Sequence, residues 1–250
     1  MPEGPSIVLL REAAARFRRR TVRSVSGNAK QDLARLQGRR VMGVHSWGKH
    51  FLLEFSGFSV RIHLLMFGSW RIDERKPTPA RLSLQFDNGE LNFYTCSVKF
   101  LEGPLQDHYD WRSDVMDERW DPRLARRRLK AQPSTLVCDA LLDQTLFSGV
   151  GNIIKNEVLY RIRVHPHTQV GDLPPRLLGR LIKEARQYSF DFLEWKRAFE
   201  LKKHWQVHTR RTCPGCGGPL SKQYLGLTRR RTFFCPHCQP LYVDGVAVDP

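Results

Sequence analysis

The sequence predicts an α+β protein with a β-rich N-terminal domain, a helical middle domain and a small metal-stapled C-terminal end. Apolar and polar residues alternate through much of the stretch from about residue 20 to residue 105, which is typical of half-buried antiparallel strands. The alternation ends at Asp121-Pro122, and the following segments have helical spacing. After residue 210, paired cysteines indicate that a bound metal takes the place of a large core.

Charge and apolar content restrict the possible function classes. The 250 residues include 41 Lys and Arg against 25 Asp and Glu, a formal charge of +16. This excess favours a polyanionic partner, above all nucleic acid, because Lys and Arg displace the counterions of phosphates. No apolar run approaches the roughly 20 residues of a membrane span. The N-terminal basic cluster follows the apolar stretch, the reverse of a signal peptide, so we expect a cytoplasmic protein, nucleoid-associated in a bacterium.

Local patterns predict the elements of the first domain. Pro5 suits the first turn of a helix, and one face of that helix carries Ile7, Leu10, Ala14 and Phe17. Alternating apolar residues then predict strands at 51–55, 60–66, 82–86 and 91–93, the last two joined by a turn at Asp87-Asn88-Gly89.

Helices are expected in the middle domain near 123–131, 134–147, 153–162 and 174–200. Gly149 and Gly151 in the turn before 153 allow the backbone to approach a ligand closely, and Asn152 is suited to cap the helix that follows. Exposed amides at such a helix start favour a phosphate site, although a turn of this kind can equally be a connector without a ligand.

Two C-x-x-C pairs near the C-terminus predict a metal site. Their spacing places four thiolates at the corners of a tetrahedron, which suits one closed, structural zinc ion better than a redox pair or a disulfide. Three consecutive arginines, Arg229 to Arg231, lie just before the second pair, where a hairpin would expose them to phosphates. Cys96 and Cys138 are expected to be small buried side chains. The zinc ligands would be Cys213, Cys216, Cys235 and Cys238.

The first residues offer covalent chemistry. Removal of Met1 would leave Pro2 with a secondary amine, which is nucleophilic in its neutral form and can form an iminium ion with the anomeric carbon of a sugar. The iminium ion acidifies the neighbouring C–H and permits elimination of the strand phosphate. Glu3 is placed for general acid–base work. The alternative is that both residues simply start a helix.

Five ordered motifs resemble the formamidopyrimidine-DNA glycosylase/endonuclease VIII family. They are MPEGP at the start, WGKHFLL at 47–53, HLLMFGSWRI at 63–72, SGVGNIIKNEVL at 148–159 and the CPGC…RRTFFCPHCQ finger at 213–239. The resemblance implies an N-terminal antiparallel β-sandwich with an N-terminal helix (1–120), a helix–two-turns–helix domain (121–209), a zinc finger (210–240) and a tail (241–250).

The resemblance also implies roles for single residues. The family's nucleophile falls on Pro2 and its general acid on Glu3, and the lysine that assists proton transfer falls on Lys49. The phosphate-binding asparagine falls on Asn152 and the zinc-finger arginine on Arg230. Base excision requires the nucleotide to be flipped out of the duplex, and the family's void-filling apolar residues fall on Leu65, Met66 and Phe67.

The resemblance is closer to the endonuclease VIII branch, which prefers oxidised pyrimidines. Ser6 replaces a frequent Glu, and residues 94–104 lack the Arg-x-Phe loop of the 8-oxoguanine branch. We therefore expect a monomeric glycosylase and AP lyase that acts on double-stranded DNA containing oxidised bases or abasic sites by β- and δ-elimination. The alternatives are an 8-oxoguanine-type glycosylase and a non-catalytic zinc-ribbon protein that binds damaged DNA.

Overall fold

The chain divides into two compact units in the computed structural model, which describes residues 2–248. The first unit ends at Trp111 and the second begins at Arg112, nearer the N-terminus than the boundary expected at residue 120. The intervening residues belong to the second unit because their backbone pairs there: Ser148 N–H donates to the Ser113 carbonyl (2.8 Å), and Val115 N–H donates to the Ser148 carbonyl (3.2 Å).

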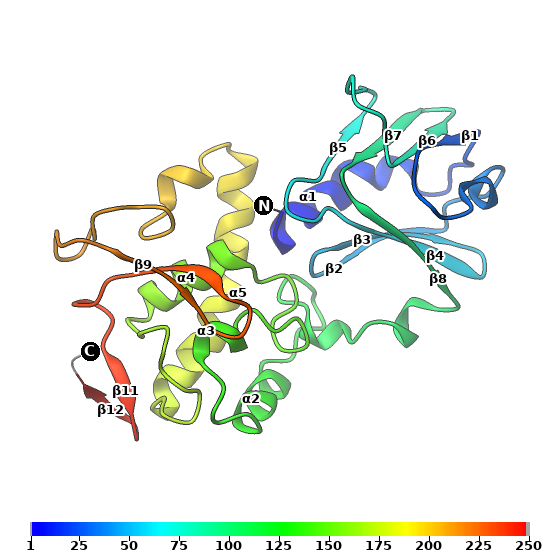
Figure 1. The fold of residues 1–250 in the computed structure, drawn as a ribbon. Helices are drawn as coiled ribbons and strands as arrows, with labels where there is room; N and C mark the ends of the chain where they lie inside the picture. The colour runs from blue at the N-terminus through cyan, green and yellow to red at the C-terminus, as the bar shows by residue number, and fades with distance from the viewer. Residues whose placement is uncertain (1, 249–250) are drawn as a thin grey trace. The chain divides into compact units, whose positions relative to one another are not determined.

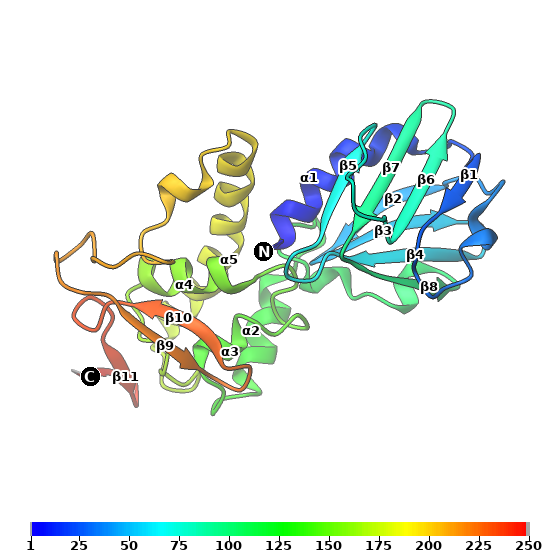
Figure 2. The ribbon, with the colours of Figure 1, turned by 45° about the horizontal axis from the view of Figure 1, so that its top comes forward.

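The first unit is a β-sandwich of two four-stranded antiparallel sheets (Figures 1 and 2). One sheet has the order β2-β3-β4-β8 and the other β1-β6-β7-β5, and helix α1 packs against β2, β3 and β5. The bounds are α1 Gly4–Ala14, β1 Ser24–Ser26, β2 Gly43–Trp47, β3 His50–Phe55, β4 Phe58–His63, β5 Ser69–Ile72, β6 Leu82–Phe86, β7 Gly89–Tyr94 and β8 Ser97–Glu102.

The core of the sandwich confirms the predicted alternation except at the end of the strand expected over 60–66, where β4 stops at His63 and Met66 is exposed. The inward residues of both sheets form one buried cluster with the apolar face of α1, because side chains two apart in a strand share a face. The turn between β6 and β7 has two residues, with Phe86 paired to Gly89, as the Asp-Asn-Gly signal predicts. Residues of this cluster named from the sequence include Ile7, Leu10, Ala14, Phe17, Phe51, Leu53, Val60, Ile62, Leu82, Leu84, Leu91 and Phe93.

The second unit is built around helix α4 (Asn152–Arg161), which is buried along residues 152–159. Helices α3 and α5 and strand β10 pack against it, and α2 packs against α5. The other helices are α2 Pro122–Lys130, α3 Val137–Ala140 and α5 Pro175–Arg197; the strands are β9 Ser221–Leu225, β10 Arg230–Phe234, β11 Leu241–Val243 and β12 Val246–Val248.

The prediction of one helix over 134–147 is wrong, because α3 spans only Val137–Ala140. The carboxylate of Asp143 accepts hydrogen bonds from the backbone N–H and the hydroxyl of Thr145, both at 2.8 Å. A short polar side chain that binds the backbone two residues ahead competes with the helical hydrogen bonds, so the apolar spacing of this segment continues as turns.

The residues after the second cysteine pair form a hairpin of β11 and β12 where a tail was expected. Asp172 holds its turn: the Asp172 carbonyl accepts from Gly245 N–H (3.1 Å) and its carboxylate accepts from Asp244 N–H (3.2 Å). The last two residues of the expected tail, 249 and 250, lie outside the described part of the chain.

A cluster of aromatic side chains lies where β3 begins and β4 ends. His50 and His63 pair across these strands, with ring centroids 5.4 Å apart, and the Tyr109 hydroxyl lies 3.3 Å from His50 Nδ1. Burial, followed by the positive charge of Arg61, lowers the pKa of His50 to about 3, and burial lowers the pKa of His63. Both imidazoles are therefore neutral at pH 7.

We predict that His50 makes the first unit sensitive to acid. The unfolded chain binds a proton at His50 below pH 6.5, whereas the folded chain does so only near pH 3. The free energy of unfolding therefore decreases as the pH is lowered from 6.5, by up to about 1.4 kcal/mol per pH unit from this group. Urea unfolding of wild type and His50→Phe from about pH 7 to pH 5 checks this, with the exposed His108→Phe as control. Equal slopes for wild type and His50→Phe would contradict it.

Candidate functional site

The start of the chain places a buried carboxyl group beside the proline. Glu3 precedes α1 in an extended conformation, and its carbonyl accepts from the Ser6 and Ile7 amides. Its side chain makes no capping hydrogen bond to the helix and is 0% exposed. Pro2 is partly exposed. A carboxyl group buried at this position, rather than capping the helix, is poorly explained by a role in starting α1 alone.

Lys49 lies in the two-residue turn between β2 and β3. Trp47 pairs with His50 across this turn, and Gly48 has a φ of +51°, which a tight hairpin turn requires of its first residue. The lysine is partly exposed and directly precedes His50, the neutral histidine that begins β3. The sandwich therefore holds the backbone of Lys49 in a defined position.

Three apolar residues between β4 and β5 are exposed. Leu65, Met66 and Phe67 have exposed fractions of 48%, 47% and 81%. Gly68 N–H closes the turn on the Leu64 carbonyl (2.7 Å), and a Cβ on Gly68 would lie only 1.9 Å from that oxygen. Because the turn needs glycine and directs apolar side chains outward, this loop has the properties of a wedge rather than of a core segment.

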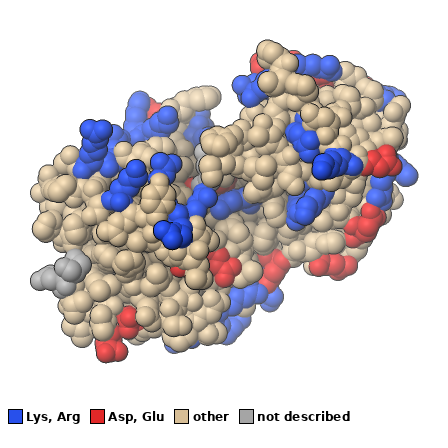
Figure 3. Space-filling model, viewed as in Figure 1, with Lys and Arg blue, Asp and Glu red and all other residues tan. Residues whose placement is uncertain are grey.

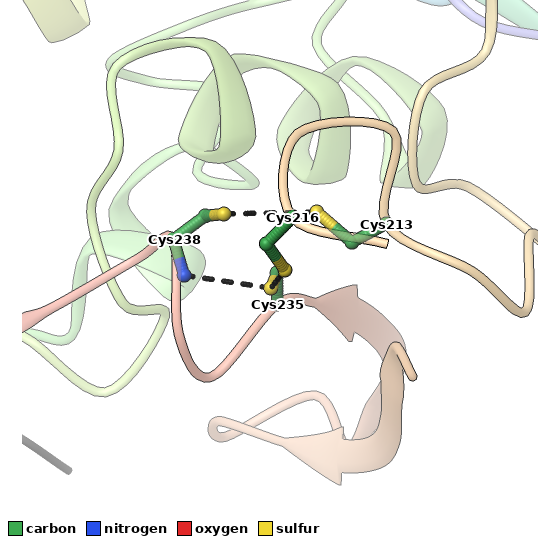
Figure 4. Close-up of side chains that lie close together, drawn as sticks. All are labelled: Cys213, Cys216, Cys235 and Cys238. Atoms are coloured by element: carbon green, nitrogen blue, oxygen red, sulfur yellow. Dashed lines mark hydrogen bonds between the residues drawn. The ribbon is translucent and has the colours of Figure 1, made fainter. Parts of the chain in front are cut away.

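The four predicted cysteines meet in the second unit (Figure 4). Their sulfur atoms all lie within 4.8 Å of one another, and two loops supply them, one before β9 and one after β10. A tetrahedral site with metal–sulfur bonds of about 2.3 Å needs sulfurs about 3.8 Å apart. The Cys213–Cys238 and Cys216–Cys235 separations are 3.7 and 3.5 Å. The four thiols can therefore hold one metal ion.

Hydrogen bonds favour a thiolate at Cys213, whereas burial raises the pKa of Cys235 and of Cys238. Although burial raises the pKa of the Cys213 thiol, the Tyr160 hydroxyl at 3.3 Å and the backbone amides of Cys216 and Gly215 lower it to about 6. The amide of Cys238 donates to Cys235 Sγ (3.4 Å) in the second loop. Thiolates are the form that binds metal.

Asn152 stands at the start of α4 but does not cap it. The N-cap is Gly151, and Asn152 is the first helical residue, so the capping role expected of it is wrong. Its Nδ2 instead donates to the Arg231 carbonyl of β10 (2.8 Å). The second Nδ2 hydrogen of Asn152 is suited to donate to a phosphate oxygen.

Arg230 begins β10, where it pairs with Leu225 of β9. Its carbonyl accepts from the Thr232 hydroxyl (3.1 Å), and that hydroxyl also accepts from Lys155 Nζ (2.7 Å). Lys155 is 1% exposed, although lysine is rarely buried without a partner. The sequence reasoning missed Lys155; its polarity among the apolar residues of a predicted buried helix was the only available signal.

Basic side chains lie over both units. Figure 3 shows Lys and Arg spread across the face drawn there, with Asp and Glu fewer. This distribution suits an extended polyanion. Among the described residues, no helix is both long and apolar enough to cross a membrane.

The predicted site residues fall in both units. Pro2, Glu3, Lys49 and the exposed loop at 65–67 belong to the first, whereas Asn152, Arg230 and the cysteine cluster belong to the second. Within the second unit, the structure joins the asparagine and the arginine through neighbouring backbone atoms of β10.

Sequence relatives of this chain carry the name Endonuclease 8-like. It is 32% identical over 240 residues to Endonuclease 8-like 3 of Xenopus laevis, covering 90% of this chain and 39% of that protein. It is 37% identical over 174 residues to Endonuclease 8-like 2 of Mus musculus, covering 67% of this chain and 50% of that protein. The chain therefore spans half or less of the length of these relatives.

Solved structures share the fold. Formamidopyrimidine-DNA glycosylase of Lactococcus lactis superimposes with a TM-score of 0.82 at 22% identity, covering 95% of this chain and 99% of that one. A viral DNA glycosylase gives a TM-score of 0.81 at 23% identity, with the same coverage of both chains. Residues 1–101 match the formamidopyrimidine-DNA glycosylase N-terminal domain, and residues 113–189 match the H2TH domain of the same enzymes. The chain belongs to the formamidopyrimidine-DNA glycosylase/endonuclease VIII family.

Proposed function

We propose that this chain is a bifunctional DNA glycosylase and AP lyase of base-excision repair, which excises oxidised bases and cleaves the strand at the same site. The observation that carries the proposal is Glu3, a fully buried carboxyl group next to Pro2 that does not cap the helix it precedes. A general acid adjacent to a secondary amine is the arrangement that imine chemistry at a sugar requires.

The proposed reaction begins when the Pro2 nitrogen, once Met1 is removed, attacks C1′ of the damaged nucleotide. The N–C1′ bond forms as the glycosidic bond breaks, and the base departs with the bonding electrons and a proton. The Pro2 nitrogen loses its own proton, and its lone pair then breaks the bond between C1′ and the ring oxygen, which leaves an open-chain iminium ion. Glu3 supplies a proton to that ring oxygen or to the departing base.

Strand cleavage follows from the iminium ion. Loss of a proton from C2′ expels the 3′ phosphate by β-elimination, and a second elimination expels the 5′ phosphate. Lys49 is assigned to assist these proton transfers, because it lies on a rigid hairpin turn and its amine can carry a proton. Water then hydrolyses the imine and regenerates the Pro2 amine.

DNA contacts in this proposal come from both units. Asn152 and Arg230 bind backbone phosphates on either side of the lesion, and Leu65, Met66 and Phe67 fill the space left by the flipped nucleotide. The exposure of these three apolar residues supports that role, since apolar wedges stabilise unstacked base steps. The partner is double-stranded DNA, and the protein acts as a monomer.

The cysteine cluster is proposed to hold one structural zinc ion. Four thiolates satisfy the tetrahedral preference of zinc and leave no coordination position open for a substrate. The ion would fix the two loops that begin and end the β9–β10 hairpin, and with them the backbone of Arg230.

Oxidised pyrimidines are the proposed preferred substrates. The sequence relatives carry the endonuclease VIII name, and residues 94–104 lack the Arg-x-Phe motif. The solved structures of the Lactococcus lactis enzyme include a complex with DNA that contains an oxidised pyrimidine and another with a benzylated formamidopyrimidine. An 8-oxoguanine preference is therefore a direct alternative to test.

We predict that borohydride traps a covalent adduct between untagged protein and duplexes that contain 5-hydroxyuracil or thymine glycol. Pro2→Gly should impair trapping because a primary amine without the proline ring replaces the secondary amine. Glu3→Gln should lower base excision by a factor of about 100 or more, the usual contribution of a general acid. Adducts are counted on denaturing gels, with an 8-oxoguanine·C duplex and an abasic duplex in parallel.

The parallel duplexes separate the alternatives. Trapping mainly on 8-oxoguanine would keep the imine mechanism and reverse the substrate preference. Binding to all duplexes without trapping or nicking would leave a DNA-binding protein without lyase activity. Retention of Met1 in mass spectra of the purified protein would exclude Pro2 as the nucleophile, because the amine would be blocked.

A second prediction concerns the metal. Cys235→Ser should reduce bound zinc from about one ion per chain to well below half, and should weaken DNA binding, because a structural site loses stability with a missing ligand. Elemental analysis and fluorescence anisotropy measure the two effects. Cys138→Ala removes a buried thiol outside the cluster and should retain the zinc. Equal zinc content in both variants would contradict the assignment.

A further inference from the structure

The turn between β9 and β10 is attached to helix α3. Both carboxylate oxygens of Asp139 accept from the backbone N–H of Leu227, at 3.1 and 3.0 Å. The Leu227 side chain is 90% exposed and adds no core contact. The Asp139 carboxylate of α3 therefore binds this residue through its backbone N–H and not through its side chain.

The sequence of the turn is adapted to this carboxylate. Gly226 has a φ of +73°, and a Cβ there would lie 2.1 Å from Asp139 Oδ1, far inside van der Waals contact. Arg229 closes the turn with its N–H on the Gly226 carbonyl (3.1 Å) and a φ of +45°. Only glycine permits both the left-handed backbone and the close approach of Asp139.

Arg230 is fixed from its other side as well. Its carbonyl accepts from Thr232, whose hydroxyl accepts from the buried Lys155, and the next carbonyl, that of Arg231, accepts from Asn152. The backbone around Arg230 thus receives hydrogen bonds from α3 on the turn side and from α4 on the strand side.

We propose that Asp139 is a positioning residue for Arg230. Together with Asn152 and Lys155 it forms a hairpin clamp, defined by these three helical side chains, that sets where the Arg230 guanidinium meets a DNA phosphate. The cysteine cluster lies at the opposite end of β9 and β10 from the turn. The cysteines therefore do not fix the turn, and the hairpin clamp does. The proposal rests on the phosphate-binding role proposed above for Arg230.

The test compares Asp139→Ala, Asp139→Asn, Arg230→Ala and the double variant Asp139→Ala/Arg230→Ala. Asp139→Asn keeps an oxygen acceptor for Leu227 N–H and loses the same charge as Asp139→Ala, so the pair separates the hydrogen bond from the charge. The probe is a fluorescein-labelled duplex with one tetrahydrofuran abasic analogue. Its Kd is measured by anisotropy over a series of salt concentrations, with zinc content measured for each protein.

We expect Asp139→Ala to raise Kd about tenfold, the factor of one charge-assisted hydrogen bond. The slope of log Kd against log salt concentration should fall by about one, the contribution of one phosphate contact. Asp139→Asn should bind nearly as wild type. The double variant should bind no more weakly than Arg230→Ala, because Asp139 acts through that arginine. If Asp139→Ala fails to fold, Gly226→Ala replaces it in the test, because the added Cβ would displace the turn from Asp139. It should raise Kd by the same factor of about ten.

Two results would overturn the inference: an Asp139→Ala effect that is equally large in the Arg230→Ala background, or wild-type binding by Asp139→Ala. Failure of the enzyme proposal is recognised separately. Absence of a borohydride adduct with wild-type protein would remove the lyase reaction, yet leave non-additive binding of the Asp139 and Arg230 variants as support for the clamp.

Discussion

The second unit depends on the burial of polar side chains along α4. Burying a polar group costs free energy unless the group finds a hydrogen-bond partner. Each buried polar side chain of this helix therefore requires a partner in a neighbouring segment. Asn152 and Lys155 find theirs on β10. Glu157 accepts from three consecutive amides, those of residues 206, 207 and 208, at 2.7–3.0 Å. Burial raises the pKa of Glu157 in spite of these donors.

This constraint explains how a finger with little core of its own holds a defined position. The described β9–β10 hairpin contributes few buried residues, and small segments of this kind usually need a metal or another staple. Here the cysteine cluster fixes one end of the hairpin, and side chains of α3 and α4 fix the other. Arg230 between them has a well-defined backbone, which would lower the entropy lost in the phosphate binding proposed for it.

In the first unit, the candidate chemistry lies at the ends of elements rather than within them. Glu3 precedes α1, Lys49 occupies the β2–β3 turn, and the apolar loop follows β4. The sandwich core holds the backbone of all three segments; the Glu3 side chain is buried, whereas Leu65, Met66 and Phe67 are exposed. The aromatic cluster at His50 and His63 stays neutral at pH 7, so it adds no charge next to Lys49.

Features that depend on neighbours in the chain were predictable from the sequence alone. Alternation predicted the strands, the Asp-Asn-Gly turn predicted the β6–β7 hairpin, and the cysteine spacing predicted the cluster, because each signal arises within a few residues. The motifs likewise marked Pro2, Glu3, Lys49, Asn152 and Arg230. The helix expected over 134–147 failed because Asp143 bonds to the backbone nearby, a competition that apolar spacing does not reveal.

The contacts that hold these residues became visible only in the folded protein. The sequence suggested that Asn152 caps α4, whereas it donates to a carbonyl 79 residues away; Lys155 reaches 77 residues to Thr232, and Asp139 reaches 88 residues to Leu227. Such pairings form when two surfaces pack together and their polar groups, now out of contact with water, hydrogen-bond to each other. A single sequence does not record that choice, because the partners share no local pattern.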